Sequence, residues 1–488
     1  MQKIDIRTLL KDPSLFKEEA YIDGKWTKAS SGETFAVTNP ATDELIAQVT
    51  NLSSREAEQA ISAAEQALPA WRAKTGKERA LIMRKWFDLI IANTQDLATL
   101  MTIEQGKPLA EAAGEVAYGA SFVEWFAEEA KRVSGAIPST TWSDKRLMVL
   151  KQPIGVCVAI TPWNFPIAMI TRKIAPALAA GCPVIFKAHP AHPKTGNLVG
   201  GAISKAVASC GLPAGVFSLI HGASNEVGSH LVQHPEIQAV GFTGSYRGGK
   251  ALYDLAVRRP HPIPVYAEMG SVNPVVLLSD KIAENPAALA AGLAGSVCMG
   301  VGQFCTNPGL LILQKKDAGF LDLLAAELDK LPLGTFLTPG ISDAYAAGVS
   351  NLAQHSKKLT SRDLPSPALF VAEAATINRV VLEEVFGPCT VAILVEDETE
   401  MISFIESLDG QLTGTIHGTK AEISEELVDA LLQKVGRLLF NGFPTGVEVS
   451  GAMVHGGPFP ATTDSRSTSV GTQAIYRFVR MVCLQNRL

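Results

Sequence analysis

The sequence has little of what marks disulfide-stapled, membrane-spanning or nucleic-acid-binding proteins. Its seven cysteines are scattered, and no C-x-x-C pair points to a zinc site or a redox couple. No stretch approaches the roughly 18 uninterrupted apolar residues of a membrane span. Lys and Arg together number 43 against 48 Asp and Glu, and the net charge of −5 provides no basic field for phosphate backbones. We therefore expect a cytoplasmic protein with reduced thiols and neither a membrane nor a nucleic acid as partner.

The composition is that of a large globular protein. Of the 488 residues, 47% are hydrophobic and 19% are charged, which supplies enough apolar material for extensive cores. At roughly 150 residues per domain, the chain has room for about three domains.

The first third of the chain is expected to be mainly helical. Two strand-like segments, YIDGKW and FAVTNPATDELIAQV, precede residues 53–133, where apolar side chains recur three and four residues apart. Ser53 or Ser54, followed by Glu56 and Glu58, is a helix-capping signature at the start of this block.

Beyond Lys151 the pattern changes to strand, turn and helix. The apolar segments are PIGVCVAITPW, CPVIFKAHP, GVFSLIHG and AVGFTGS, with a helix ending near Ala208 between the second and the third. A second such region follows from about Ile263 to Gly456, with PVVLL, LLILQ, ALFVA, CTVAILV and RLLFN as strands. Apolar runs without polar alternation indicate strands covered on both faces, so we predict two open α/β domains with parallel sheets.

The tail after Gly471, IYRFVRMVCLQ, is an apolar strand candidate with nothing after it to cover it. Because an uncovered strand edge is a template for pairing, this segment predicts contact with another subunit.

Cys305 is the first candidate for chemistry. It lies in MGVGQFCTNPG, where glycines and a proline surround the thiol, as in loops that approach a ligand closely. The alternative for any single cysteine is a small buried hydrophobe, which is how we interpret the other six.

Glu268 and Asn164 are two further candidates. PVYAEMGSVNP places Glu268 in an apolar strand-like run before a turn, where desolvation would raise its pKa toward that of a general base. TPWNFP holds Asn164 between two aromatic residues and two prolines, and a fixed amide is a neutral donor toward an oxyanion. A turn asparagine that satisfies local backbone groups is the alternative.

The nucleotide-binding signals are incomplete. No G-x-G-x-x-G follows the first strand of the α/β region, and GFTGSYRGGK resembles a P-loop except that Ala251, without a hydroxyl, follows Lys250. This argues against an NTP-dependent enzyme, although Ser245 and nearby amides suit a pyrophosphate at a helix N-terminus. His189 and His192 lie among prolines without a matching carboxylate, so we predict no metal site.

Taken together, the motifs resemble those of the NAD(P)-dependent aldehyde dehydrogenases over essentially the whole chain. Six of them occur in the order that this family has: TPWNFP (161–166), FK (186–187), FTGS (242–245), EMGSVNP (268–274), GQFC (302–305) and EEVFGP (383–388). The resemblance implies the aldehyde dehydrogenase fold, with two open parallel-sheet domains and a small β element for oligomerisation. It assigns cofactor binding to residues 1–129 and 151–262, catalysis to 263–456, and assembly into a homodimer or homotetramer to 130–150 and 471–488.

The resemblance also implies roles for the three candidate residues. Cys305 would be the nucleophile that forms a thiohemiacetal and then a thioester with the substrate. The Asn164 amide and the Cys305 backbone N–H would hold the oxyanion. Glu268 would be the general base that activates water to release a carboxylic acid.

The cofactor is expected to be NADP, with NAD possible. By resemblance, Lys187 lies near its adenosine ribose, Ser245 contacts its pyrophosphate, and Glu384 and Phe386 position its nicotinamide ribose and ring. Trp163 is a further cofactor-binding residue. Many NAD-preferring relatives carry a Glu three residues after the lysine, where this chain has Pro190. The missing carboxylate would otherwise repel a 2′-phosphate.

Subfamily resemblance is divided. Up to about Pro183 the chain resembles succinate-semialdehyde dehydrogenases, and from KAHPAHP onward it resembles 2,5-dioxopentanoate (α-ketoglutarate semialdehyde) dehydrogenases, so a composite chain is one hypothesis. The predicted reaction is oxidation of 2,5-dioxopentanoate to 2-oxoglutarate, with succinate semialdehyde as the alternative substrate and a catalytically silent member of the fold as a further alternative. Arg172 matches an arginine that holds the substrate carboxylate in the succinate-semialdehyde group; a structural ion pair is the other interpretation.

Overall fold

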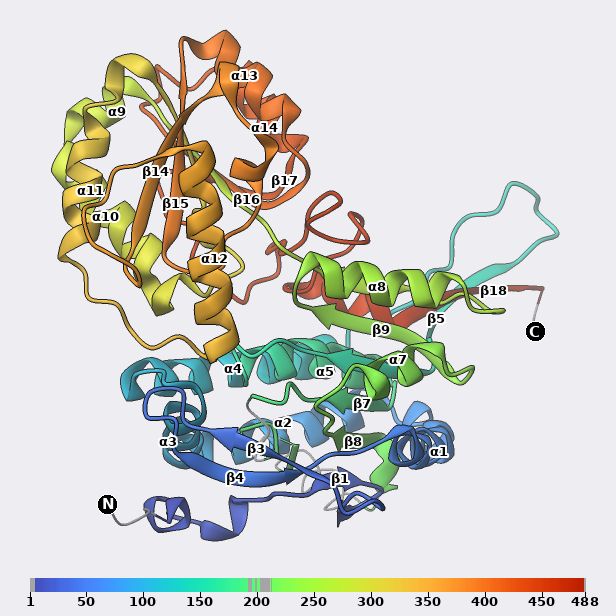
Figure 1. Cartoon of the computed structure of the whole chain (residues 1–488). Coiled ribbons are helices and arrows are strands. Elements are labelled where there is room, and N and C mark those ends of the chain that lie inside the picture. Colours follow the sequence, from blue (N-terminus) through green and yellow to red (C-terminus); the bar gives the residue numbers. More distant parts are fainter. Residues whose placement is uncertain (1–4, 192–194, 198–199, 202–210, 212, 487–488) are drawn as a thin grey trace. The chain divides into compact units, whose positions relative to one another are not determined.

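In the computed structural model (Figure 1), the chain forms two compact units. The described residues are 5–191, 195–197, 200–201, 211 and 213–486. Unit 1 comprises Met1–Ala267, Val449–Ala452 and Ser469–Leu488, and unit 2 comprises Glu268–Glu448 and Met453–Thr468. The assignment of chain segments to cofactor binding, catalysis and assembly remains a prediction.

Unit 1 is built on a seven-stranded sheet whose strand order is β10-β9-β6-β7-β8-β1-β2. The neighbours β9, β6, β7 and β8 are parallel, whereas β1 is antiparallel to both β8 and β2. The apolar runs predicted as strands form β6 (Val156–Ile160), β7 (Val184–Lys187), β8 (Phe217–Ile220) and β9 (Ile237–Thr243). β10 (Val265–Glu268) and β2 (Lys25–Thr27) are the edge strands, and β1 (Ala20–Ile22) lies between β8 and β2.

Helices of unit 1 follow the predicted periodicity. The helical block forms α1 (Ser54–Arg72), α2 (Gly76–Ala92), α3 (Thr94–Gln105) and α4 (Leu109–Glu129), followed after β6 by α5 (Ala168–Ala180) and later by α7 (Glu226–Gln233) and α8 (Tyr246–Val257). The capping prediction is confirmed, because the Ser53 side chain caps α1 and Glu56 completes the reciprocal pair. The helix expected to end near Ala208 falls largely on residues outside the described ranges.

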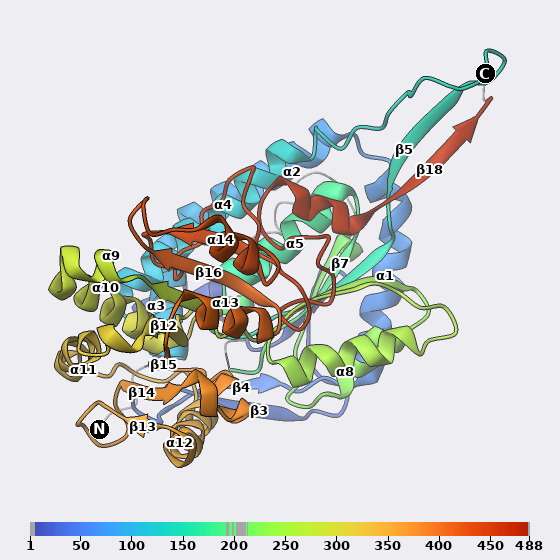
Figure 2. The ribbon, with the colours of Figure 1, turned by 90° about the horizontal axis from the view of Figure 1, so that it is seen from above.

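Two antiparallel ribbons complete unit 1. One pairs β3 (Thr34–Thr38) with β4 (Leu45–Thr50), and the other pairs β5 (Leu147–Pro153) with the C-terminal β18 (Val479–Gln485). Figure 2 shows the second ribbon extending away from the helices of its own unit. The tail therefore finds a strand partner within its own chain, and the pairing with another subunit stays a prediction.

Unit 2 has a second seven-stranded sheet, with the order β13-β14-β15-β12-β11-β16-β17. Its strands are parallel except for the antiparallel edge strand β13. The bounds are β11 (Pro274–Leu277), β12 (Leu310–Gln314), β13 (Lys357–Lys358), β14 (Ala368–Glu373), β15 (Cys389–Val395), β16 (Gln411–His417) and β17 (Val435–Phe440). Sequence reasoning identified five of these strands and missed β13 and β16.

Helices cover both faces of this sheet. Along β11, Val276 joins a core with α12 (Pro339–His355), α13 (Glu398–Ser407) and α14 (Glu425–Leu432). Its neighbours Val275 and Leu277 join the opposite core with α10 (Pro286–Cys298) and α11 (Phe320–Lys330); α9 (Ser279–Glu284) precedes them. Alternate side chains therefore enter opposite cores, as a doubly covered parallel sheet requires. The predicted fold class, two open α/β domains with largely parallel sheets, is confirmed. Among the described helices, none has the length and apolar content needed to cross a membrane.

Candidate active site

The loop that carries Cys305 has a constrained backbone. It follows a 3-10 turn, Met299–Gly302, in which Gly300, Val301 and Gly302 have φ of 53°, 59° and 64°. A Cβ on Gly302 would collide with the backbone carbonyl of Gly387, so only glycine permits this approach of the two loops. The backbone of the Gly387 loop therefore lies close to the backbone of the loop that carries the thiol.

The side chain of Asn273 fixes the loop from the other side. Its Nδ2 donates to the carbonyl oxygens of Cys305 (2.9 Å) and Asn307 (2.8 Å), while its Oδ1 accepts from Ser271 Oγ (2.9 Å) and Thr413 Oγ1 (3.0 Å). Asn273 is fully buried, so each of these bonds replaces one that water would make. Sequence reasoning quoted this asparagine only as part of EMGSVNP and gave it no role.

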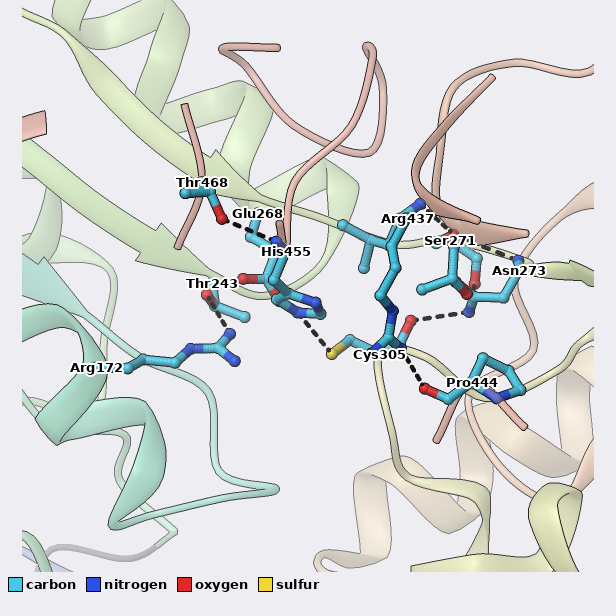
Figure 3. A network of polar contacts seen from close by, with 12 residues as sticks. Arg172, Thr243, Glu268, Ser271, Asn273, Cys305, Arg437, Pro444, His455 and Thr468 are labelled. Carbon is cyan, nitrogen blue, oxygen red and sulfur yellow. Dashed lines mark hydrogen bonds and ion pairs between the residues drawn. The ribbon is translucent and has the colours of Figure 1, made fainter. Parts of the chain in front are cut away.

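The thiol of Cys305 and the carboxylate of Glu268 both contact one nitrogen of His455 (Figure 3). His455 Nε2 is 2.9 Å from Glu268 Oε1 and 3.5 Å from Cys305 Sγ. The Glu268 and His455 side chains are 1% and 0% exposed, whereas Cys305 is half-buried. The structure thus brings the two predicted residues together, and their roles as base and nucleophile remain predictions. Sequence reasoning missed His455, because this residue lies in none of the six quoted motifs.

The same three side chains have the composition of a metal site. Their nearest ligand atoms lie within 4.8 Å of one another. Ligands on a tetrahedral zinc ion, at about 2 Å from it, are roughly 3.3 Å apart, which is longer than the N–O separation here. That separation of 2.9 Å is the length of a hydrogen bond.

The predicted nicotinamide-binding loop of unit 2 contacts the cysteine loop. Asn307 Nδ2 donates to the Gly387 carbonyl oxygen (3.2 Å), and residues of both loops, including Phe304, Glu384 and Phe386, line one small cavity. Surrounding protein raises the pKa of Glu384 to about 7, yet this residue keeps an exposed surface through which a ligand can reach it. The Glu384 carboxylate lies against the backbone of Gly270, where a Cβ would collide with it.

Asn164 lies in unit 1, in the loop between β6 and α5. Its residue is 5% exposed, and its backbone oxygen accepts from Lys107 Nζ (3.1 Å). Lys107 pairs with the buried Glu115, whose Oε1 accepts from the Ile167 N–H (2.9 Å). Gln105 donates to the Trp163 carbonyl, so the helical block holds the TPWNFP loop in place.

Three predicted cofactor contacts of unit 1 lie near one edge of its sheet. Lys187 ends β7 and is in register with Ile160 at the end of β6, which in turn pairs with Phe242 near the end of β9. Trp163 follows β6, and Ser245 follows β9 as the N-cap of α8, accepting from the Gly248 N–H (3.2 Å). The carboxyl edge of an open parallel sheet is where such folds bind nucleotides, so these residues suit a dinucleotide. Burial lowers the pKa of Lys187 to about 8.

Arg172 is buried in α5 of the same unit. Its guanidinium lies 3.5 Å from Thr243 Oγ1 at the end of β9, and the neighbouring Lys173 donates to the same oxygen. This contact positions the guanidinium, and its predicted role toward a substrate carboxylate stays a prediction.

Comparisons with known proteins agree on one family. The model described as the aldehyde dehydrogenase family matches residues 26–459. An alpha-ketoglutaric semialdehyde dehydrogenase of Azospirillum brasilense is 41% identical over 486 residues, covering 94% of this chain and 92% of the relative. The NADP-dependent succinate-semialdehyde dehydrogenase GabD of Escherichia coli K12 is 39% identical over 81% of this chain and 84% of its own.

Among solved structures, a succinate-semialdehyde dehydrogenase from Burkholderia pseudomallei has a TM-score of 0.87 and 33% identity, covering 98% of this chain and 100% of that chain. Both kinds of relative align with most of the sequence, and a composite origin stays a prediction.

Proposed function

The chain belongs to the aldehyde dehydrogenase family, and we propose that it oxidises a short semialdehyde with a distal carboxylate, using NADP or NAD. The observation that carries this proposal is the meeting of Cys305 Sγ and the Glu268 carboxylate at His455, on a loop whose backbone is fixed from two sides. The preferred substrate is 2,5-dioxopentanoate, which would give 2-oxoglutarate. Succinate semialdehyde is the second candidate, because relatives with that activity match the chain almost as well.

In this proposal the chemistry proceeds through a covalent bond to Cys305. The thiolate attacks the aldehyde carbon, a C–S bond forms, and the carbonyl π electrons move to oxygen. The Asn164 amide and the Cys305 N–H stabilise that oxyanion. A nicotinamide held by the residues named below would supply the acceptor for the hydride that leaves this carbon as its C=O bond re-forms. Glu268 then takes a proton from water, the resulting hydroxide attacks the thioester carbon, and the C–S bond breaks with its electron pair on sulfur.

We propose NADP as the preferred cofactor. Lys187, with its pKa near 8, keeps most of its positive charge at pH 7, and that charge favours an anionic group on the ribose. Pro190 places no carboxylate there to repel a 2′-phosphate. Ser245 at the N-terminus of α8 suits the pyrophosphate, and Glu384 with Phe386 suits the nicotinamide ribose and ring.

We also propose a homodimer or homotetramer located in the cytoplasm. An isolated two-stranded ribbon is marginal in water, so the β5–β18 ribbon gains stability from a second copy. The cysteines in the described part of the chain are free thiols, as is usual in a reducing compartment.

The test is a panel of aldehydes with NADP or NAD, followed by nicotinamide absorbance. The proposal predicts turnover of carboxylated semialdehydes, with 2,5-dioxopentanoate having the highest kcat/KM. No turnover of any aldehyde by a folded protein would favour a silent member of the fold. Arg172→Leu should raise KM for carboxylated aldehydes about tenfold or more and leave uncharged aldehydes nearly unaffected, since a charge-assisted pair contributes about 1.5–3 kcal/mol. Equal losses on both would give Arg172 a structural role.

A further inference from the structure

His455 contacts both members of the proposed catalytic pair through a single nitrogen. Its Nε2 lies 2.9 Å from Glu268 Oε1 and 3.5 Å from Cys305 Sγ, the latter within the longer range of sulfur hydrogen bonds. Glu268 at the end of β10 and Cys305 in the loop before β12 are titratable groups that contact this nitrogen. In the tautomer with its hydrogen on Nδ1, the imidazole has a lone pair at Nε2 that can accept the thiol proton, and the Nε2–H so formed can then donate to the carboxylate.

The surrounding loop holds the imidazole in this position. The His455 backbone N–H donates to Thr468 Oγ1 (2.8 Å), and Gly457, with φ of 146°, passes so close to the Gln411 carbonyl that no side chain fits. The Arg437 guanidinium, on β17, donates to the carbonyl oxygens of Pro444 and Gly446 earlier in the loop, each at 2.7 Å. The placement of His455 is therefore fixed by several independent contacts.

A thiol needs such a partner to react at neutral pH. An ordinary cysteine has a pKa of about 8.5 and is only a few per cent thiolate at pH 7. An adjacent imidazolium stabilises the thiolate electrostatically, as in other cysteine–histidine pairs. Glu268 in turn stabilises the imidazolium, because it presents a carboxylate oxygen to the same nitrogen.

We propose that His455 is a further catalytic residue that takes the Cys305 proton before attack on the aldehyde. The S–H bond breaks with its electron pair left on sulfur, and an N–H bond forms at Nε2, so the trio keeps its net charge as thiolate, imidazolium and carboxylate. When the thioester is hydrolysed, the departing thiolate is stabilised by the same Nε2–H. This inference rests on the proposed function for its aldehyde step, but the proton transfer itself requires neither substrate nor cofactor.

The test is alkylation of the full-length protein, without aldehyde or nicotinamide, by iodoacetamide between pH 5 and pH 10. Modification of the Cys305 peptide is followed by mass spectrometry. In the unmutated protein the rate should reach half its maximum at least one pH unit below the ordinary thiol value of about 8.5. In His455→Gln the midpoint should return toward that value, and the rate at pH 7 should fall about tenfold.

His417→Gln is the matched control, because His417 is also buried in unit 2, at the end of β16, and packs against Phe443. Its alkylation profile should equal that of the unmutated protein. His455→Ala provides a second variant if the glutamine variant misfolds, and circular dichroism checks each fold.

Three results would overturn the proposal. They are an ordinary thiol profile in the unmutated protein, an unchanged profile in a folded His455 variant, and the same shift in His417→Gln. Loss of the low midpoint after dialysis against a chelator would instead make the trio a metal site. Because alkylation needs no aldehyde, a normal shift with no aldehyde turnover would count against the proposed function and leave the cysteine–histidine pair standing.

Discussion

At the scale of single residues, the protonation of Glu384 changes near neutral pH. Surrounding protein raises the pKa of its carboxyl group to about 7, although one surface of the residue remains exposed. The carboxyl group is therefore mostly neutral at pH 6 and mostly a carboxylate at pH 8. Because the folded-state pKa exceeds the unfolded value, this group's contribution to stability falls as pH rises from about 4.5 to 7.

The pKa of Glu384 predicts a pH-dependent cofactor affinity. A carboxylate accepts hydrogen bonds from ribose hydroxyls, and protonation removes part of that capacity. The KM for NADP should therefore rise as pH falls from 8 to 6. Glu384→Gln should raise this KM about tenfold at pH 8 and remove most of the dependence, since hydrogen bonds to a charged group contribute about 1.5–3 kcal/mol.

Initial rates across this pH range, with Glu383→Gln as control, provide the measurement. Glu383 precedes Glu384 in the same exposed loop, and its variant should keep the unmutated KM and pH dependence. A Glu384→Gln enzyme that retained the pH dependence of KM would assign it to another group.

At the scale of elements, apolar runs predicted most of the parallel strands, because a strand covered on both faces needs apolar side chains on both faces. β16 was missed for the opposite reason: its sequence, QLTGTIH, contains buried polar residues such as Thr413 and Thr415. Thr413 donates to Asn273 in the network that fixes the cysteine loop. A central strand that serves a polar network lacks the pattern by which strands are recognised.

The role of His455 also could not be recognised from a local sequence pattern. Cys305, Glu268 and the family motifs were visible in the sequence, but contact among residues 268, 305 and 455 depends on tertiary folding. The glycines that follow His455 were the available local signal, because they indicate a close approach of backbone. No spacing rule relates a histidine to a cysteine 150 residues earlier.

The position of the cysteine loop should depend on Asn273. Asn273→Ala removes two donors from the carbonyls of Cys305 and Asn307 and leaves buried partners unsatisfied, so the free energy of unfolding should fall by about 2–4 kcal/mol. We expect kcat to fall at least tenfold, because a displaced loop misplaces the thiol. Urea unfolding and steady-state kinetics provide the two measurements.

Thr413→Val is the matched control for this prediction. It removes one donor to Asn273 Oδ1 and leaves the bonds to the loop carbonyls in place. It should cost about 1 kcal/mol of stability and little kcat. An Asn273→Ala enzyme with normal kcat would mean that the loop holds its shape without this side chain.

At the scale of the whole molecule, the β5–β18 ribbon and the segment that precedes β5 carry exposed apolar side chains. Ile137, Trp142 and Met481 are 80%, 65% and 74% exposed, and Met148 is 42% exposed. A hollow beside the ribbon is lined by Ile137, Met148 and Leu484, among others. Apolar surface of this extent marks interaction sites, which supports assembly through the ribbon.

Met481→Asp should therefore weaken assembly. A charge in a covered apolar contact is costly, so sedimentation velocity should detect a shift toward the 51.8 kDa monomer. Leu323→Asp, at an exposed apolar residue of α11 in unit 2, is the control and should leave the assembly unchanged. Equal sedimentation of Met481→Asp and unmutated protein would place the subunit contact elsewhere.

The central claim, that Cys305 carries the acyl group and Glu268 activates the water that removes it, is tested most directly by trapping the intermediate. Glu268→Gln is mixed with NADP and 2,5-dioxopentanoate, quenched in acid and digested for mass spectrometry. We predict one equivalent of nicotinamide reduced per active site and an acyl group on the Cys305 peptide that hydroxylamine removes. A reduced nicotinamide signal with no adduct on Cys305, or with an adduct on another residue, would contradict the account.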